Sequence, residues 1–422
     1  MIVHQSRERG GGRAAWHWRA NAVVVGYLAA TLVAMGFHVA GRTSAWLPVH
    51  ILLLGAATNA IVVWTLHFTT TLLHPAQKRA PRYLPRLVIL NIAVLGIVSG
   101  ASMHRSVLVV LAAALFGVVI VSHGWFLLCA LVTMRAPRFA VTAWFYCAAL
   151  VALMFGATAG TALSVGVQAG WYTRLLAAHV HANVFGWIAL TVLGTQVAFW
   201  PMVLRTRIGA GTESAARQAF PLCAGGLALT LAGLMAGGRP LAIVGLAGYI
   251  AGAARTLEPF VRTAAARPPR TPAAWMLAAA TGWLVVALVT DLATVVRAAG
   301  LAAVAVDIEQ FVPWVLAGFV AQVLMGALTY LLPVVLGGGP AGGRRIAIVL
   351  DRWGFTRVTA FNIGVVLVAL RLPPGVTRIG WACVAAAAGS FVVLAAAAFR
   401  LTRAHASGLP VQSPMMEESE KS

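Results

Sequence analysis

Long apolar runs recur along almost the whole chain, from about residue 21 to residue 400. Of the 422 residues, 60% are apolar and only 10% are charged, and the mean hydropathy is +0.87. A soluble domain of this size would need far more charge on its surface. An apolar helix of about 20 residues is long enough to cross a bilayer. The sequence therefore predicts an all-α, polytopic membrane protein.

Twelve transmembrane helices are expected in one transmembrane domain, residues 21–400, between a basic N-terminal segment, 1–20, and a polar tail, 401–422. The first apolar run is too long for the apolar core of a signal peptide, so we expect it to be kept as a span. The predicted spans are about 21–41, 45–73, 84–101, 104–133, 139–165, 171–201, 218–236, 240–255, 272–297, 310–337, 355–371 and 374–400.

The net charge of +21 is explained by topology. With the N-terminus placed inside, the inner segments carry 24 Lys and Arg and the outer segments carry 7, which together are all 31. This bias predicts a plasma-membrane protein with both termini in the cytoplasm. No basic stretch outside the spans is interleaved with aromatic residues, so no nucleic-acid partner is expected.

The four cysteines lie singly inside apolar runs, at Cys129, Cys147, Cys223 and Cys383. No CxxC pair occurs, which excludes the CxxCH motif of covalently attached haem. We expect each cysteine to be a small packing residue.

The second, sixth and tenth spans share a pattern. In "HILLLGAATNA", "HANVFGWIALT" and "PWVLAGFVAQV" a glycine stands five residues after the first position, at Gly55, Gly186 and Gly318. The match between the last two segments continues at a constant offset of 132 residues. A spacing of four spans predicts three pseudo-repeated four-helix units, about 21–133, 139–255 and 272–400, with chance similarity of apolar helices as the alternative.

Histidines in the second and sixth spans are the candidate site. If the repeat is real, His50 and His181 occupy equivalent positions near the outer surface and face each other. His179 and His181 differ by about 200° around a helix axis, so they cannot bind one metal from a regular helix. Two facing imidazoles can bind one haem iron. Gly55 and Gly186 could leave room for a macrocycle; hydrogen bonding and close packing between helices are the alternatives.

The stretch "AHVHANVFGW" resembles the haem-ligand helix of the heme-copper oxidase subunit I superfamily, especially its nitric oxide reductase and C-type oxidase branch. In that family an HxH motif carries ligands of two haems, and "LPVHILLLGAATNA" is similar to the segment with the remaining axial ligand. The resemblance implies His50 and His181 as axial ligands of a low-spin haem b, and His179 as a ligand of a second haem or another metal. Arg174, one turn before His179, would contact the haem propionates.

The sequence also departs from that family. Its HxH lies in the sixth span, whereas the family has it in the tenth. No His-His pair occurs and the last six spans contain no histidine, so no distal copper site is recognisable. Asp291 is the only acid placed clearly inside a predicted span, which argues against the acidic proton relays of a typical reductase centre.

A second stretch, "LTVLGTQVAFWPMVLRTRI", is similar to actinobacterial membrane modules joined or adjacent to multicopper oxidase or copper nitrite reductase domains. The two resemblances together imply a b-type haem protein that passes electrons between a quinol pool, or a bound substrate, and a copper protein at the outer face. Its alternatives are a haem-free transporter or channel, and a membrane protein for haem or copper sensing or assembly.

Overall fold

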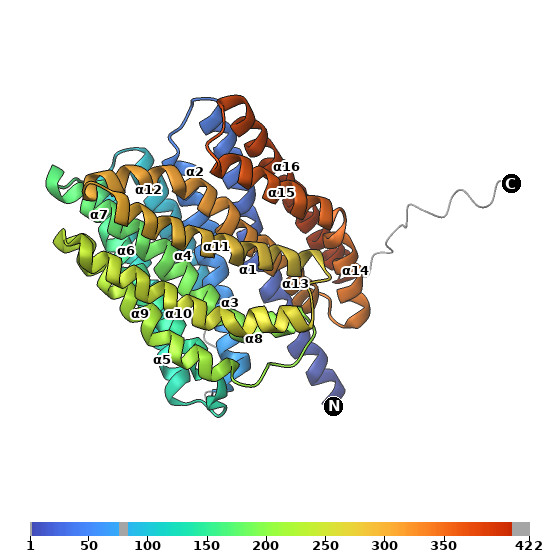
Figure 1. The fold of residues 1–422 in the computed structure, drawn as a ribbon. Coiled ribbons are helices and arrows are strands. Elements are labelled where there is room, and N and C mark those ends of the chain that lie inside the picture. The colour runs from blue at the N-terminus through green and yellow to red at the C-terminus, as the bar shows by residue number, and fades with distance from the viewer. Residues whose placement is uncertain (1, 76–82, 407–422) are drawn as a thin grey trace.

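The computed structural model describes residues 2–75 and 83–406, and these form helices joined by short connections, with no strand among them (Figure 1). The α-helices are α1 (Ile2–Val39), α2 (Trp46–His50), α3 (Thr58–Leu73), α4 (Tyr83–Ser102), α5 (Ser106–Val132), α6 (Ala140–Val165), α7 (Ala169–His181), α8 (Thr191–Val203), α9 (Thr212–Ala236), α10 (Arg239–Ala266), α11 (Pro272–Arg297), α12 (Leu301–Val315), α13 (Gln322–Leu336), α14 (Pro340–Asp351), α15 (Gly354–Ala369) and α16 (Pro374–Ala406). Three π-helices, η1 (Ile51–Ala57), η3 (Ala182–Leu190) and η4 (Leu316–Ala321), and one 3₁₀ turn, η2 (Pro137–Phe139), complete the chain.

Eleven helices in this part of the chain are long and apolar enough to cross a membrane. The one remaining predicted span, 355–371, corresponds to α15, a shorter apolar helix. The all-α class is therefore confirmed, and the long apolar helices are consistent with a polytopic membrane protein. The expected N-terminal segment continues α1 as helix, α16 extends to Ala406, and the rest of the expected tail lies outside the described residues.

Three long rods form the centre of the bundle, and each is interrupted by a π-helix. The rods are α2–η1–α3, α7–η3–α8 and α12–η4–α13, and their apolar windows are 72%, 67% and 61% buried, against 56% or less for the other spans. The π-helices contain Gly55, Gly186 and Gly318. Together with α11, the rods enclose a cavity of about 80 Å³, lined almost entirely by apolar atoms. π-helical turns are rare in proteins, and many of those that occur lie at functional sites.

Pairs of antiparallel helices surround the rods: α4 with α5, α9 with α10, and α15 with α16 (Figure 1). Glycines set their close approach. A Cβ at Gly226 would overlap the backbone of Tyr249, and one at Gly364 would lie 2.6 Å from the carbonyl oxygen of Gly380. Helices in a membrane associate through such small-residue contacts, because burial of apolar surface gives them little drive in lipid.

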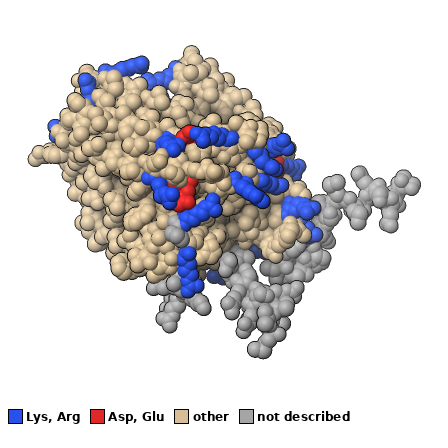
Figure 2. All heavy atoms as spheres, turned by 60° about the horizontal axis from the view of Figure 1, so that its bottom comes forward, with Lys and Arg blue, Asp and Glu red and all other residues tan. Residues whose placement is uncertain are grey.

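Basic side chains gather at one end of the bundle, where α8, α10 and α13 end and α9, α11 and α14 begin; we call this the basic end. Figure 2 shows Lys and Arg side chains crowded around few acidic ones on the face seen there. The basic end carries Arg205, Arg207, Arg217, Arg255, Arg262, Arg267, Arg270, Arg344, Arg345 and Arg352. The histidines of the candidate site lie toward the opposite, far end.

Candidate functional site

The candidate histidines lie where α-helix changes to π-helix. His50 is the last residue of α2, directly before η1, and His181 is the last residue of α7, directly before η3. His179 precedes His181 on α7. Because a π-turn is wider than an α-turn, it shifts the register of everything that follows it on the rod.

His50 and His179 form a pair of imidazoles. Their ring centroids lie 6.2 Å apart with an angle of 21° between the ring planes. Two imidazoles on opposite sides of one metal ion would have centroids about 6 Å apart, from two metal–nitrogen bonds of about 2 Å and about 1 Å from each nitrogen to its ring centre. The observed separation is close to that distance, and the two rings are stacked with nearly parallel planes.

Backbone carbonyls hold both rings in one orientation. His50 Nδ1 lies 2.8 Å from the carbonyl oxygen of Trp46, and His179 Nδ1 lies 2.8 Å from that of Gly156. A carbonyl can only accept, so each Nδ1 donates its proton and each neutral ring keeps its Nε2 lone pair. Metal-binding histidines commonly have their second nitrogen fixed in this way.

The surroundings of the two rings are tightly packed. Trp46 stacks on His50 with centroids 4.0 Å apart, and Asn183 donates to the carbonyl oxygen of His179 at 2.7 Å. Gly160 of α6 lies against the other ring, where an added Cβ would be 2.6 Å from His179 Cε1. This glycine is therefore needed for the position of the His179 ring.

His181 lies in a different environment. Its Nε2 is 2.9 Å from Oδ2 of Asp291 on α11, and both side chains are fully buried. Its Nδ1 donates to the carbonyl oxygen of Ala177 at 2.8 Å, and the ring of Phe185 packs beside it. The second carboxyl oxygen of Asp291 has no hydrogen-bond partner among the described residues.

The expectation that His50 faces His181 is therefore wrong, because the structure pairs His50 with His179. Residues two apart on α7 point to nearly opposite sides, as the helical geometry predicted. The side that faces the first central rod carries His179, and the side that faces α11 carries His181. The repeat aligned His50 with His181 in sequence, but it did not determine which imidazole faces His50.

The spaces beside Gly55 and Gly186, where a macrocycle could have fitted, are filled by neighbouring side chains. The ring of Tyr27 occupies the space over Gly55, and Ala152 with Leu227 occupies the space over Gly186. In this structure these glycines serve close helix packing.

Arg174 lies at the far end but is directed to α9. Its Nη1 donates to the carbonyl oxygen of Met235 at 3.4 Å, its guanidinium lies over the ring of Trp171, and Gly237 leaves space for it. A cation at the C-terminal end of a helix stabilises the unpaired carbonyls there.

Two further histidines are buried outside the candidate site. His123 is 3% exposed, and its Nε2 lies 2.9 Å from the hydroxyl of Thr65. His17 is 2% exposed, and its ring contacts the rings of Trp64 and His67.

Sequence reasoning also missed the pairing of Asp291 with His181. A signal was available, because Asp291 is the acid placed inside a span and stands near its outer end, as His181 does. Ionisable groups within membranes usually pair with one another.

No protein-family model matches this chain, and no curated protein is significantly similar to it. The resemblance to the heme-copper oxidase superfamily rests on the sequence motifs alone.

Proposed function

We propose that this protein is a membrane b-type haem protein for electron transfer, with His50 and His179 as the axial ligands of one haem. The observation that carries the proposal is the pair of imidazoles on two central rods, 6.2 Å apart at their centroids, each with Nδ1 held by a backbone carbonyl.

The number of protein donors suits a haem. Among the described residues, no cluster of three or more His, Cys, Asp or Glu is placed to hold a metal ion. A bare zinc or copper ion in a protein usually takes three or four protein ligands. A haem iron needs only the two axial ones, because the macrocycle supplies the other four.

Within this proposal, backbone carbonyls, a glycine and one carboxylate position the histidines. The carbonyl groups of Trp46 and Gly156 fix the tautomers of the two ligands, while Gly160 leaves space for the His179 ring. Asp291 keeps His181 turned away from His50, so the account assigns His181 no axial bond. A bound haem b would supply one-electron chemistry, and these residues would set its orientation and surroundings.

The wider setting follows from the sequence motifs. The electrons would pass between a quinol pool or bound substrate and a copper protein at the outer face, without a distal copper site in this chain. We also propose the three four-helix units, 21–133, 139–255 and 272–400, and cytoplasmic termini in the plasma membrane. Two observations support the repeat. Each central rod contains a π-helix, and each rod is followed by a pair of helices packed closely at glycines.

A second candidate is a bare metal ion, copper above all, between His50 and His179, in a protein for copper sensing or assembly. The filled spaces over Gly55 and Gly186 favour it, because an ion needs no slot for a macrocycle. Imidazole is a common ligand of copper.

One purification separates these candidates. The full-length protein in detergent is assayed by reduced-minus-oxidised absorption spectroscopy, pyridine haemochrome quantification and elemental analysis for iron and copper. We expect about one haem b per chain. Copper at a similar ratio without haem would support the second candidate, and a preparation with neither would leave the transporter or channel alternative.

A further inference from the structure

A hollow at the basic end has no part in the proposed haem site. It is a cavity of about 540 Å³ between the connection that follows α8 and the last turns of α10. Three arginines line it, Arg207, Arg255 and Arg262, against a single acid, Glu258. The described residues that line the cavity therefore carry a net charge of +2.

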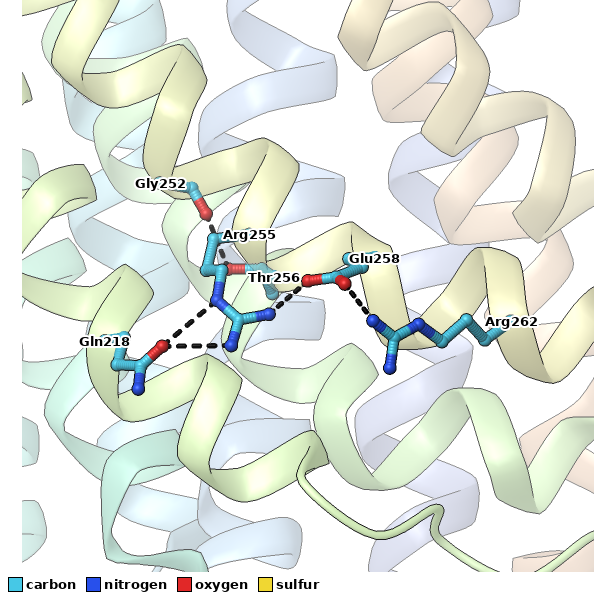
Figure 3. Close-up of polar contacts among 6 residues, drawn as sticks. All are labelled: Gln218, Gly252, Arg255, Thr256, Glu258 and Arg262. Atoms are coloured by element: carbon cyan, nitrogen blue, oxygen red, sulfur yellow. Dashed lines mark hydrogen bonds and ion pairs between the residues drawn. The ribbon is translucent and has the colours of Figure 1, made fainter.

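Two of the arginines are held in place by neighbouring side chains (Figure 3). Arg255 directs Nε and Nη2 at the side-chain oxygen of Gln218 on α9, at 3.1 and 3.0 Å. Glu258 pairs with Arg255 on one side and with Arg262 on the other. One carboxylate thus orders two guanidinium groups, and their other N–H donors stay available to a further acceptor.

The opposite wall adds more positive potential. Arg207 is exposed and makes no hydrogen bond or ion pair with the described residues. Thr212, the first residue of α9, lines the same cavity directly after Gly211, which has a φ of +80°. The first turn of a 25-residue helix therefore borders the same cavity as the three arginines. Guanidinium groups and helix N-termini both favour phosphate.

The position of the cavity points to a lipid source for that phosphate. It lies where spans end, the level at which lipid headgroups lie. Val261, next to Arg262 on α10, is 68% exposed, so apolar surface adjoins the arginines. A free phosphate would use only the charged part of this surface, whereas a phospholipid would use both.

We infer that this cavity binds the phosphate of an anionic phospholipid, independently of any haem. Arg207, Arg255 and Arg262 would contact the phosphate oxygens, and the acyl chains would lie along the exposed apolar side of α10. Such basic pockets between membrane helices are suited to anionic headgroups.

The test is lipid titration of the full-length protein in detergent, followed by native mass spectrometry. Phosphatidylglycerol, phosphatidylcholine and inorganic phosphate are compared on the wild type, on Arg207→Gln/Arg255→Gln, and on Arg344→Gln. Arg344 is an exposed arginine of α14 that lies at the basic end but outside the cavity, so its variant controls for the loss of one positive charge at this end. Size-exclusion profiles and thermal midpoints without added lipid show that each variant is folded.

We expect phosphatidylglycerol to bind the wild type in preference to phosphatidylcholine, and affinity to fall about fivefold for each arginine of the cavity that is removed. Arg344→Gln should retain wild-type affinity. Equal weakening in the double variant and in Arg344→Gln, or no weakening in the double variant, would overturn the site. Binding of inorganic phosphate as tight as that of phosphatidylglycerol would overturn the lipid assignment.

Discussion

His179 and His181 are two residues apart on one helix, yet their environments differ in kind. His179 faces a second imidazole, and its Nδ1 is fixed by a backbone carbonyl. His181 is fully buried, and both of its ring nitrogens have hydrogen-bond partners. A neutral imidazole that donates one hydrogen bond to a carbonyl still has a free nitrogen that can bind a metal. An imidazole whose other nitrogen is hydrogen-bonded to a carboxylate instead stabilises that buried carboxylate.

The difference shows how far an HxH motif can be interpreted without a structure. Both histidines stand in one motif and look equally suited to iron. The neighbouring helices give them separate environments, because α2 contributes His50 on one side and α11 contributes Asp291 on the other. The three predictions that follow test this separation, from the largest expected effect to the smallest.

Removal of Asp291 should have the largest effect on stability. Asp291→Ala would leave His181 buried without its carboxylate, at a cost of about 3–5 kcal/mol in the free energy of unfolding. Denaturant unfolding in detergent measures this cost. Because His181→Leu/Asp291→Leu removes both partners, it should be much more stable than Asp291→Ala alone. A wild-type midpoint for Asp291→Ala would show that the pair is not structural.

A methyl group at position 160 should disturb His179. In Gly160→Ala the new Cβ would lie 2.6 Å from the His179 ring, which must move. We expect a loss of about 1–3 kcal/mol in stability and a weakened metal or haem signal. Gly170→Ala, at a position with no atoms near the added Cβ, should change stability by under about 1 kcal/mol and keep the signal. Equal metal or haem signals in Gly160→Ala and Gly170→Ala would show that cofactor binding does not depend on the position of the His179 ring.

The smallest effect concerns the π-helix after His181. Tyr249 donates its hydroxyl to the carbonyl oxygen of Phe185, inside η3, at 2.7 Å. Tyr249→Phe keeps the ring and should cost about 1 kcal/mol. Tyr172→Phe, at an exposed position, should change stability by under about 0.5 kcal/mol. A larger cost for Tyr172→Phe than for Tyr249→Phe would mean that this hydrogen bond does not support the π-helix.

Much of the fold could be predicted from the sequence, because apolar length and helical periodicity report directly on membrane helices. The three glycines of the shared pattern, Gly55, Gly186 and Gly318, all lie in π-helices, although no pattern in the residues revealed that the turns there would be wide. The helix α14 was not predicted, since its glycine-rich start is typical of a turn.

Less of the candidate site could be predicted. Helical geometry correctly sent His179 and His181 to opposite sides, but it could not say which neighbour each would meet. That depends on how α2, α6 and α11 pack around α7, through contacts such as the one between Gly160 and the His179 ring. The partner of His181, Asp291, lies 110 residues away in sequence. Such a long-range pairing leaves no local pattern.

The most direct test of the proposed ligand pair is the reduced-minus-oxidised spectrum of purified variants, normalised to protein. The account predicts that His50→Ala and His179→Ala each lose the b-type haem signal, while the folded His181→Leu/Asp291→Leu variant retains it. Loss of the signal in the double variant together with its retention in His179→Ala would contradict the account, and would assign the iron to His50 and His181 instead.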